Sequence, residues 1–277
     1  MNNNKRMKKM ATKKTPVEVK KTPVKKVKTV KEPHIFIATP MYGGMCSGFY
    51  VQSLLPLEKL LAEHGIKSSF SFMFNESLIQ RARNALASVF MRNDTYTHLM
   101  FIDADIKFNP NDLVHMVKAD VDVICGIYPK KEINWQGVKN AVDNNVPVDQ
   151  LKKYTGSLVV NLVNYSGEVT VPVNKPVQIW NGGTGFMLIK KTALTKMKKH
   201  VNSYVNDVLD TSGTIKQDII HEFFPVMIEP ETGRLLSEDY AFCYLCRKHG
   251  IKIWAAPWAQ LGHMGSYLFE GGLLPAP

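Results

Sequence analysis

The sequence Thr97-His-Leu-Met-Phe-Ile-Asp-Ala-Asp-Ile106 decides the fold of this chain. Its apolar residues run from Leu99 to Ile102 without a break, and Asp103 and Asp105 follow directly. An apolar run without alternation is typical of a strand buried on both faces, as in a parallel sheet. Ligands of open α/β sheets bind beyond the carboxyl ends of the strands. We therefore expect both carboxylates at the ligand-binding edge of a sheet.

The Asp-x-Asp spacing has two interpretations. Carboxylate oxygens are hard ligands that suit Mg²⁺ or Mn²⁺, and such ions usually also take oxygens from a substrate phosphate. Aspartate is also common in turns at the ends of strands, and an isolated Asp-x-Asp often arises by chance. The neighbouring sequence has to decide between a metal site and a turn.

The segments on either side alternate between apolar strands and amphipathic helices. Strands are expected over residues 34–38, 66–74, 121–127, 186–189 and 251–255. Helices are expected over 51–64, from Ser77, from Asn109, after residue 190, and from Ser237 to Gly250. This alternation is typical of an α/β fold in which helices flank a mostly parallel sheet.

Several boundaries carry more specific predictions. Pro56 should bend the first helix or mark its true start. Ser77 and Gln80 have the spacing of a capping box, and Asn109 precedes a proline that suits the first turn of a helix. Residues 132–176 are polar and irregular apart from 157–163, and 202–222 show little periodicity, so both stretches are expected to be mainly loop.

The basic charge of the chain lies almost entirely in its first residues. Residues 1–33 hold twelve Lys or Arg and two Glu, a net charge of +10, whereas the whole chain carries +11. We expect a disordered Lys-rich tail over 1–33 and one domain over 34–277. The tail is interpreted as a solubilising or weakly anion-attracting arm. Because the domain is nearly neutral, nucleic-acid binding by it is not expected.

Cysteine usage and hydropathy point to a reducing, cytoplasmic setting. The four cysteines form no disulfide framework, and Cys243 and Cys246 fall within a helical pattern, which favours core packing. The sequence has no run of roughly 18 apolar residues and no apolar signal-peptide core. We expect no membrane span.

Four further motifs have both a structural and a functional interpretation. Gly182-Gly-Thr-Gly185 predicts either a close backbone approach to a ligand or a tight turn. Ser237-Glu-Asp239 is an ordinary helix start, but a carboxylate there could also be a general base. Arg81 and Arg83 are either solvated or help to bind an anion, and His263 between two glycines could approach an ion closely.

Taken together, these segments resemble the GT-A glycosyltransferases, particularly family-2-like enzymes of bacteria and large DNA viruses. The resemblance spans about residues 34–270 in collinear order and leaves the tail out. The matching segments are Glu76-Ser-Leu-Ile-Gln-Arg-Ala-Arg-Asn84, His98-Leu-Met-Phe-Ile-Asp-Ala-Asp105, Cys125-Gly-Ile-Tyr-Pro-Lys-Lys131, Asn181-Gly-Gly-Thr-Gly-Phe186, Ser237-Glu-Asp-Tyr-Ala-Phe-Cys243 and Leu261-Gly-His263.

The resemblance implies a GT-A fold and a role for each matching residue. Asp105 would be the direct ligand of Mn²⁺ or Mg²⁺, Asp103 would lie nearer the ribose or a metal-bound water, and His263 would be the distal ligand. Asp239 would be the catalytic base of an inverting enzyme, and Glu238 would contact the acceptor. The nucleotide-sugar would be held by Thr39, Pro40, Tyr42, Arg81, Arg83, Asp103, Ala104, Gly182 and Gly183.

These residue types suit transfer of a sugar from a UDP- or GDP-sugar to a glycan or glycoprotein. A divalent ion stabilises the growing charge of the diphosphate leaving group, and a carboxylate takes the proton of the acceptor hydroxyl. Two alternatives are a nucleotidyltransferase on a similar sheet and a non-enzymatic protein that binds nucleic acid through its tail. The absence of a basic residue from the loop 41–48 counts against the first, and the near-neutral domain counts against the second.

Overall fold

The computed structural model describes residues 32–158, 160–163, 170–209, 215–271 and 273. Side chains of residues 207–209 and 215–216 are not described. The described part belongs to one compact unit, Glu32–Pro277. The tail predicted over 1–33 lies almost wholly outside the described residues, so the disorder expected there stays a prediction.

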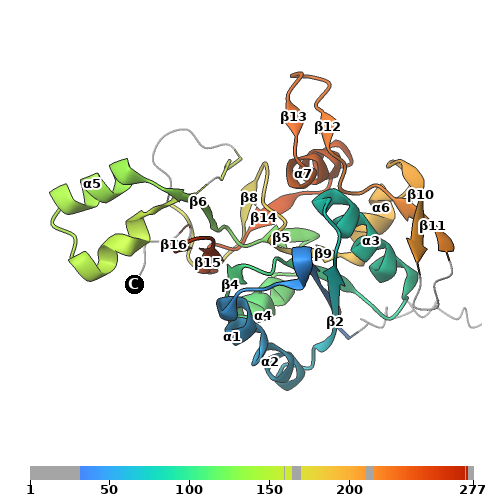
Figure 1. Cartoon of the computed structure of the whole chain (residues 1–277), viewed down its shortest axis with the longest axis horizontal. Coiled ribbons are helices and arrows are strands. Elements are labelled where there is room, and N and C mark those ends of the chain that lie inside the picture. Colours follow the sequence, from blue (N-terminus) through green and yellow to red (C-terminus); the bar gives the residue numbers. More distant parts are fainter. Residues whose placement is uncertain (1–31, 159, 164–169, 210–214, 272, 274–277) are drawn as a thin grey trace, which may run out of the picture. The chain divides into compact units, whose positions relative to one another are not determined.

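A seven-stranded sheet forms the centre of the unit (Figure 1). Its order is β2-β1-β3-β9-β5-β14-β8, and all strands run in one direction except β9 and β8. The prediction of a mostly parallel α/β sheet is therefore confirmed. The strands are β1 His34–Met41, β2 Lys67–Phe74, β3 His98–Ile102, β5 Val123–Cys125, β8 Val177–Ile179, β9 Phe186–Lys190 and β14 Ile253–Ala255.

Strand β3 lies inside the sheet and is buried on both faces, as its unbroken apolar run predicts. Leu99 and Phe101 pack into the core on one face, and Met100 and Ile102 pack into the core on the other. All four side chains are fully buried. Burying such residues stabilises the fold by about 1.5–3 kcal/mol each, so this strand is fixed in register and direction.

Helices cover both faces of the sheet and complete three layers (Figure 1). One face is covered by α1 Gly48–Leu54, α2 Leu57–Glu63 and α4 Pro110–Lys118. The other is covered by α3 Ile79–Arg92, α6 Lys191–Met197 and α7 Glu238–Lys248. Cys125, Cys243 and Cys246 are free and buried here, which confirms the prediction of core packing.

The helix boundaries confirm two predictions and correct a third. Pro56 separates α1 from α2, and Asn109 caps α4 by accepting a hydrogen bond from the Asn111 amide. The capping box at Ser77 is wrong, because α3 begins at Ile79 after Leu78. The Glu76 carboxylate accepts a 3.0 Å hydrogen bond from the Leu78 amide, and this local bond holds the chain extended past Ser77.

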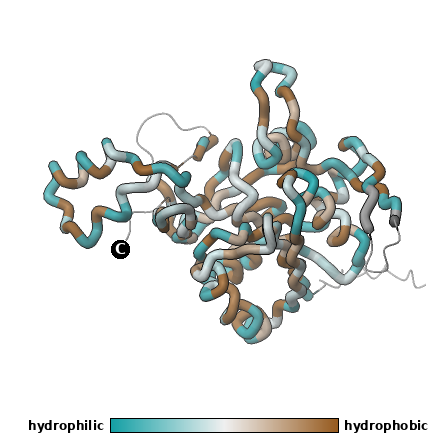
Figure 2. The backbone as a smooth tube through the Cα atoms, viewed as in Figure 1, coloured by the Kyte–Doolittle hydropathy of each residue, from teal (hydrophilic) through white to brown (hydrophobic). Residues whose placement is uncertain are grey.

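Both stretches expected to be mainly loop contain regular structure. Residues 132–176 include the last two residues of β6 Pro129–Ile133, together with α5 Trp135–Asp143, η2 Val148–Tyr154 and β7 Gly156–Leu158. Helix α5 alternates between hydrophilic and hydrophobic residues but buries only Ala141 (Figure 2). The stretch 202–222 forms an antiparallel pair, β10 Ser203–Leu209 and β11 Ile215–His221.

Shorter elements lie at the carboxyl edge of the sheet and beside it. Strands β4 Ile106–Lys107, β15 Leu261–Met264 and β16 Leu268–Gly271 form one small sheet, and β12 Met227–Ile228 pairs with β13 Leu235–Leu236. The single-turn helix η1 Tyr42–Gly44 follows β1. Within the described part of the chain, no helix has the length and apolar character needed to cross a membrane.

Candidate functional site

The Asp103-Ala104-Asp105 segment is fixed by backbone hydrogen bonds to three different parts of the chain. The Asp103 amide donates to the Gly185 carbonyl at 2.9 Å. The Ala104 and Asp105 carbonyls accept from the Ser47 and Met264 amides, each at 2.8 Å. The Ile106 amide also donates to the Asp103 carbonyl and closes a turn. The turn interpretation therefore describes the backbone, while both carboxylates stay at the carboxyl end of β3.

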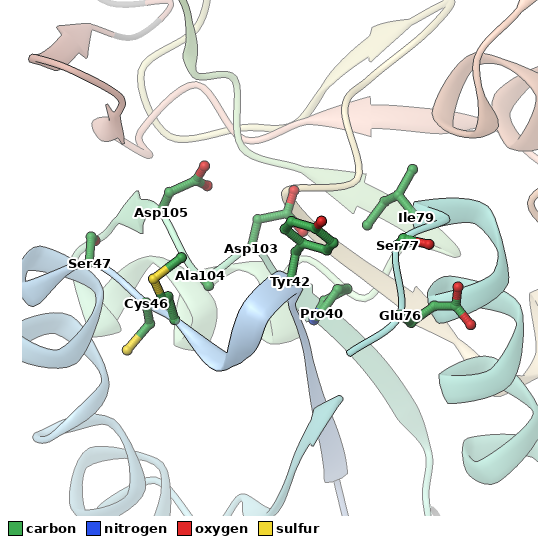
Figure 3. A pocket seen from close by; sticks show the side chains of 11 residues that line it. Pro40, Tyr42, Cys46, Ser47, Glu76, Ser77, Ile79, Asp103, Ala104 and Asp105 are labelled. Atoms are coloured by element: carbon green, nitrogen blue, oxygen red, sulfur yellow. The ribbon is translucent and has the colours of Figure 1, made fainter. Parts of the chain in front are cut away.

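A first cavity of about 400 Å³ opens over this segment (Figure 3). One wall carries Cys46 and Ser47, and the other carries Glu76, Ser77 and Ile79. Of the residues predicted to hold a nucleotide-sugar or metal, five line this cavity: Pro40, Tyr42, Asp103, Ala104 and Asp105. The Tyr42 side chain is 72% exposed, so its ring is available to a ligand.

A second cavity of about 540 Å³ is lined by three other residues predicted to belong to the site, Gly183, Asp239 and His263. Tyr128, Lys130 and Lys131 also line it, although no role was predicted for them. The linings of the two cavities touch at Asp105, although no described residue lines both. The Asp105 Oδ2 atom, on the first cavity, lies 3.6 Å from His263 Nε2 and 2.5 Å from Lys131 Nζ, which belong to the second.

Asp105 and His263 are arranged as two ligands of one divalent ion would be. His263 Nδ1 lies 2.9 Å from the Pro129 carbonyl, which can only accept, so Nδ1 carries a proton and Nε2 is the ring nitrogen that faces Asp105. Metal-binding histidines usually have such a partner on the other ring nitrogen. Burial alone would raise the pKa of Asp105, but His263 and Lys131 outweigh it and hold the pKa below its ordinary value.

The protein offers only part of a coordination shell at this point. The described residues contain no group of three or more His, Cys, Asp or Glu that could hold a metal ion. Mg²⁺ is commonly bound through one or two carboxylates, with waters and substrate phosphate oxygens in the remaining positions. Asp105 fits that pattern, whereas an imidazole such as His263 is a usual ligand of transition metals, so the mixed donor set favours Mn²⁺ over Mg²⁺.

Arg83 is buried and joins two carboxylates of the site. Its Nη2 donates to both oxygens of Asp103 at 3.0 Å, and its Nε donates to Glu238 Oε1 at 3.3 Å. The Arg83 side chain is only 3% exposed, and it packs over the Phe101 ring. Arg83 was expected to be either solvated or near an anion such as the nucleotide diphosphate. Its guanidinium is instead internal, where it holds the Asp103 and Glu238 side chains.

Two other residues predicted to bind the nucleotide point elsewhere. Thr39 is fully buried, and its hydroxyl shares a 2.8 Å hydrogen bond with the Tyr50 hydroxyl. Thr39 therefore holds α1 against β1 and has no exposed surface for a ligand. Arg81 is half exposed and forms a 2.9 Å ion pair with Glu76, through which it adjoins the first cavity.

The start of α7 separates the two carboxylates predicted there. Ser237 occupies the N-cap position, and Asp239 accepts hydrogen bonds from the Ser237 hydroxyl and the Tyr240 amide. Asp239 lines the second cavity, whereas Glu238 turns inward to Arg83. Burial raises the pKa of Glu238; the Arg83 guanidinium opposes this increase, and the Asp239 carboxylate adds to it. Asp239 is thus the carboxylate within reach of a ligand.

The Gly182–Gly185 loop packs closely against Cys125 and Tyr128. A Cβ atom at Gly182 would collide with the Cys125 sulfur, and one at Gly183 would collide with the Tyr128 ring. The Gly185 amide donates to the Tyr128 hydroxyl at 3.0 Å, and burial raises the pKa of that hydroxyl. Close packing against Cys125, rather than a tight turn, explains Gly182, while Gly183 also borders the second cavity.

Sequence reasoning missed the roles of Tyr128 and Lys131, although a signal was present. Tyr128 comes three residues after the buried strand β5, as Asp105 comes three residues after β3, and Lys131 lies on the next strand, β6. A polar residue that directly follows a buried strand in an α/β sheet is a candidate for the ligand-binding edge.

Comparison with known proteins finds proteins of similar structure but none of similar sequence. No protein-family model matches the sequence, and no curated protein is detectably similar to it. The A197 protein from STIV is 16% identical, with coverage of 88% of this chain and 97% of that chain and a TM-score of 0.44.

Glycosyltransferases are also among the similar solved structures. The enzyme involved in glycosylation of the major capsid of PBCV-1 is 12% identical, covering 59% of this chain and 63% of that one, with a TM-score of 0.28. GalNAc-T7, crystallised with UDP, GalNAc and Mn²⁺, is 10% identical. The match covers 89% of this chain and 45% of that chain, with a TM-score of 0.38. This chain spans less than two thirds of the length of both. These likenesses assign no activity to it.

Proposed function

We propose that this chain is a metal-dependent glycosyltransferase that moves a sugar from a nucleotide-diphosphate sugar to a hydroxyl of a glycan or glycoprotein. The observation that carries this proposal is the meeting of two cavities at Asp105. One cavity holds the Asp-x-Asp carboxylates, and the other holds His263 and Asp239. A donor and an acceptor need such adjoining sites, because their reacting atoms must come within about 3–3.5 Å of each other.

The first cavity suits the nucleoside diphosphate. The exposed Tyr42 ring can cover a base, Pro40 borders the same space, and Asp103 is held in place to accept a hydrogen bond from a ribose hydroxyl. A Mn²⁺ or Mg²⁺ ion held by Asp105 and His263 would neutralise charge on the diphosphate as it leaves. The donor is expected to be a UDP- or GDP-sugar.

The second cavity suits the acceptor. Asp239 faces this space from the first turn of α7, where hydrogen bonds from Ser237 and Tyr240 fix its Oδ1. Its carboxylate would accept the proton of the acceptor hydroxyl as that oxygen bonds to the sugar carbon and the diphosphate departs. Attack from the face opposite the leaving group inverts the configuration of the sugar. A base in this position typically contributes about 10²–10⁴-fold to the rate.

The test measures thermal stability with UDP, GDP, CDP and ADP, each with and without Mn²⁺. A ligand at 100 times its dissociation constant adds about 2.7 kcal/mol to the free energy of unfolding. We expect a shift for one nucleotide that requires Mn²⁺ and is lost in Asp105→Ala. No shift with any pair would contradict the proposal.

Asp239→Asn supplies the matched control, because it keeps the shape of the side chain and removes the base. It should retain the Mn²⁺-dependent shift while release of nucleoside diphosphate from the donor, in the presence of a glycan acceptor mixture, falls by about 10²–10⁴-fold. An Asp239→Asn variant with undiminished turnover would refute the role of Asp239 without affecting the donor site.

A further inference from the structure

Two side chains approach one carboxylate oxygen where the linings of the two cavities touch. Asp105 Oδ2 has Lys131 Nζ at 2.5 Å and His263 Nε2 at 3.6 Å. A divalent ion bound to this oxygen and to His263 would lie beside the Lys131 ammonium. Two cations would then share one carboxylate oxygen, and like charges at such close range repel each other. Lys131 and the ion therefore compete for Asp105.

Lys131 can leave Asp105 without disturbing the fold. It lies on β6, its side chain is 40% exposed, and it lines the open second cavity. The carbon stem passes Gly265, where a Cβ atom would lie only 3.2 Å from Lys131 Cδ. The absence of a side chain at Gly265 leaves this path open, and the four-carbon stem of lysine gives the ammonium several positions within reach.

A diphosphate gives the displaced ammonium a new partner. The donor diphosphate proposed above would bring negative charge to the junction of the cavities, where Lys131 already lies. We propose that Lys131 is an exchangeable counter-ion: it neutralises Asp105 in the metal-free protein, and it turns to the diphosphate when the metal ion binds. This inference rests on the proposed metal site and adds a residue that couples metal binding to donor binding.

The exchange predicts that the metal ion binds more tightly when the diphosphate is present. A metal ion alone has to break the ion pair between Lys131 and Asp105, whereas in the presence of diphosphate Lys131 forms a new ion pair with a phosphate. Each ligand therefore tightens the binding of the other, and such coupling is reciprocal. Without Lys131, the metal ion alone should bind more tightly, because its competitor is gone.

Lys130 provides a matched control next in sequence. It also lines the second cavity, but its ammonium pairs with Glu132 at 3.5 Å. Lys130→Met removes the same charge as Lys131→Met from the same strand. Methionine has nearly the length of lysine and adds no oxygen ligand, so neither variant creates a new metal ligand.

The experiment titrates Mn²⁺ alone into the full chain by isothermal titration calorimetry. Lys131→Met should bind Mn²⁺ about 10-fold more tightly than the parent protein, in the range usual for coupled sites, and Lys130→Met should stay within about 2-fold. Lys131→Met binding no more tightly than Lys130→Met would overturn the inference.

Asp105→Asn separates this failure from failure of the metal site itself. If Asp105→Asn loses Mn²⁺ binding while Lys131→Met merely equals the parent protein, the metal site stands and the exchange is refuted. If Asp105→Asn binds Mn²⁺ as the parent does, or if no variant binds it, the metal site and the exchange both fail.

Discussion

At the scale of single residues, the site depends on a buried guanidinium. Arg83 contacts Asp103 at the end of β3 and Glu238 at the start of α7, two residues that come from distant parts of the chain. Its Nη1 atom is buried and has no hydrogen-bond partner among the described residues. The planar guanidinium has donors on several edges, so it can hold both carboxylates at once.

Replacing Arg83 by Met should strongly destabilise the protein. The change leaves the partly buried Asp103 and Glu238 carboxylates without their cation, and breaking a buried ion pair in this way typically costs about 3–5 kcal/mol. The measurement is urea unfolding followed by circular dichroism. Arg81→Met is the control, because the Arg81 ion pair with Glu76 is half exposed and should contribute at most about 1 kcal/mol. An equal loss of unfolding free energy in both variants would contradict the proposed role of Arg83 in holding Asp103 and Glu238.

At the scale of secondary-structure elements, the sequence predicted those elements that carry a strong local signal, such as the fully buried strand β3 and the capped helix α4. The unbroken apolar run 99–102 predicted a strand with two buried faces, and Asn109 with Pro110 predicted the start of α4. Helix α5 was missed although Trp135, Val138, Ala141 and Val142 recur at helical spacing, because the stretch around it is polar and only Ala141 is buried. Strands β10 and β11 were missed because their apolar residues do not alternate regularly with polar ones.

Side-chain contacts between distant segments could not be predicted from the sequence for a different reason. Arg83 and Glu238 are 155 residues apart, and Lys131 on β6 and Asp105 in the turn after β3 are 26 residues apart. No local pattern encodes such a contact. The positions of Asp103 and Asp105 were predictable because they follow a strong strand signal, and that of Asp239 because it stands at a helix start. The inward direction of Arg83, in contrast, depends on its contacts with Asp103 and Glu238.

Helix α4 contains a buried carboxylate that should make stability depend on pH. Asp112 is 6% exposed, and its Oδ2 has no hydrogen-bond partner among the described residues. Burial raises the pKa of Asp112 from 3.8 to about 7, although a hydrogen bond with the Asn109 backbone opposes the increase. The native state therefore binds this proton more tightly than the unfolded state. The resulting stability is complete below pH 3.8 and is lost as the pH rises toward 7.

Replacing Asp112 by Asn should remove this loss. The free energy of unfolding of Asp112→Asn, minus that of the parent protein, should rise between pH 4 and pH 7 by up to about 4 kcal/mol and then level off. Urea unfolding at several pH values measures the difference. Asp149→Asn, at an exposed position in η2, should show no such rise. A flat difference for Asp112→Asn would contradict the burial of a charged group.

At the scale of the whole molecule, the residues of the proposed site and the net positive charge belong to different parts of the sequence. The proposed ligands and base, Asp105, His263 and Asp239, come from separate segments that meet at the two cavities. The described unit begins at Glu32. Residues 1–31 carry twelve of the 35 Lys or Arg and one of the 24 acidic residues, so residues 32–277 have no net charge. Charge and proposed chemistry are thus divided between two parts of the sequence.

This division makes removal of residues 1–31 a decisive test between the transferase and a nucleic-acid-binding protein. The truncated chain should keep the Mn²⁺-dependent stabilisation by nucleotide, because all residues proposed for the site lie between Pro40 and His263. Binding of the full chain to DNA should be weak, salt-dependent and lost on truncation, since it would come from lysines contacting phosphates. Fluorescence anisotropy with labelled DNA at 50 and 200 mM salt measures that binding. Loss of nucleotide binding on truncation, with tight DNA binding by the full chain at 200 mM salt, would instead favour the nucleic-acid role.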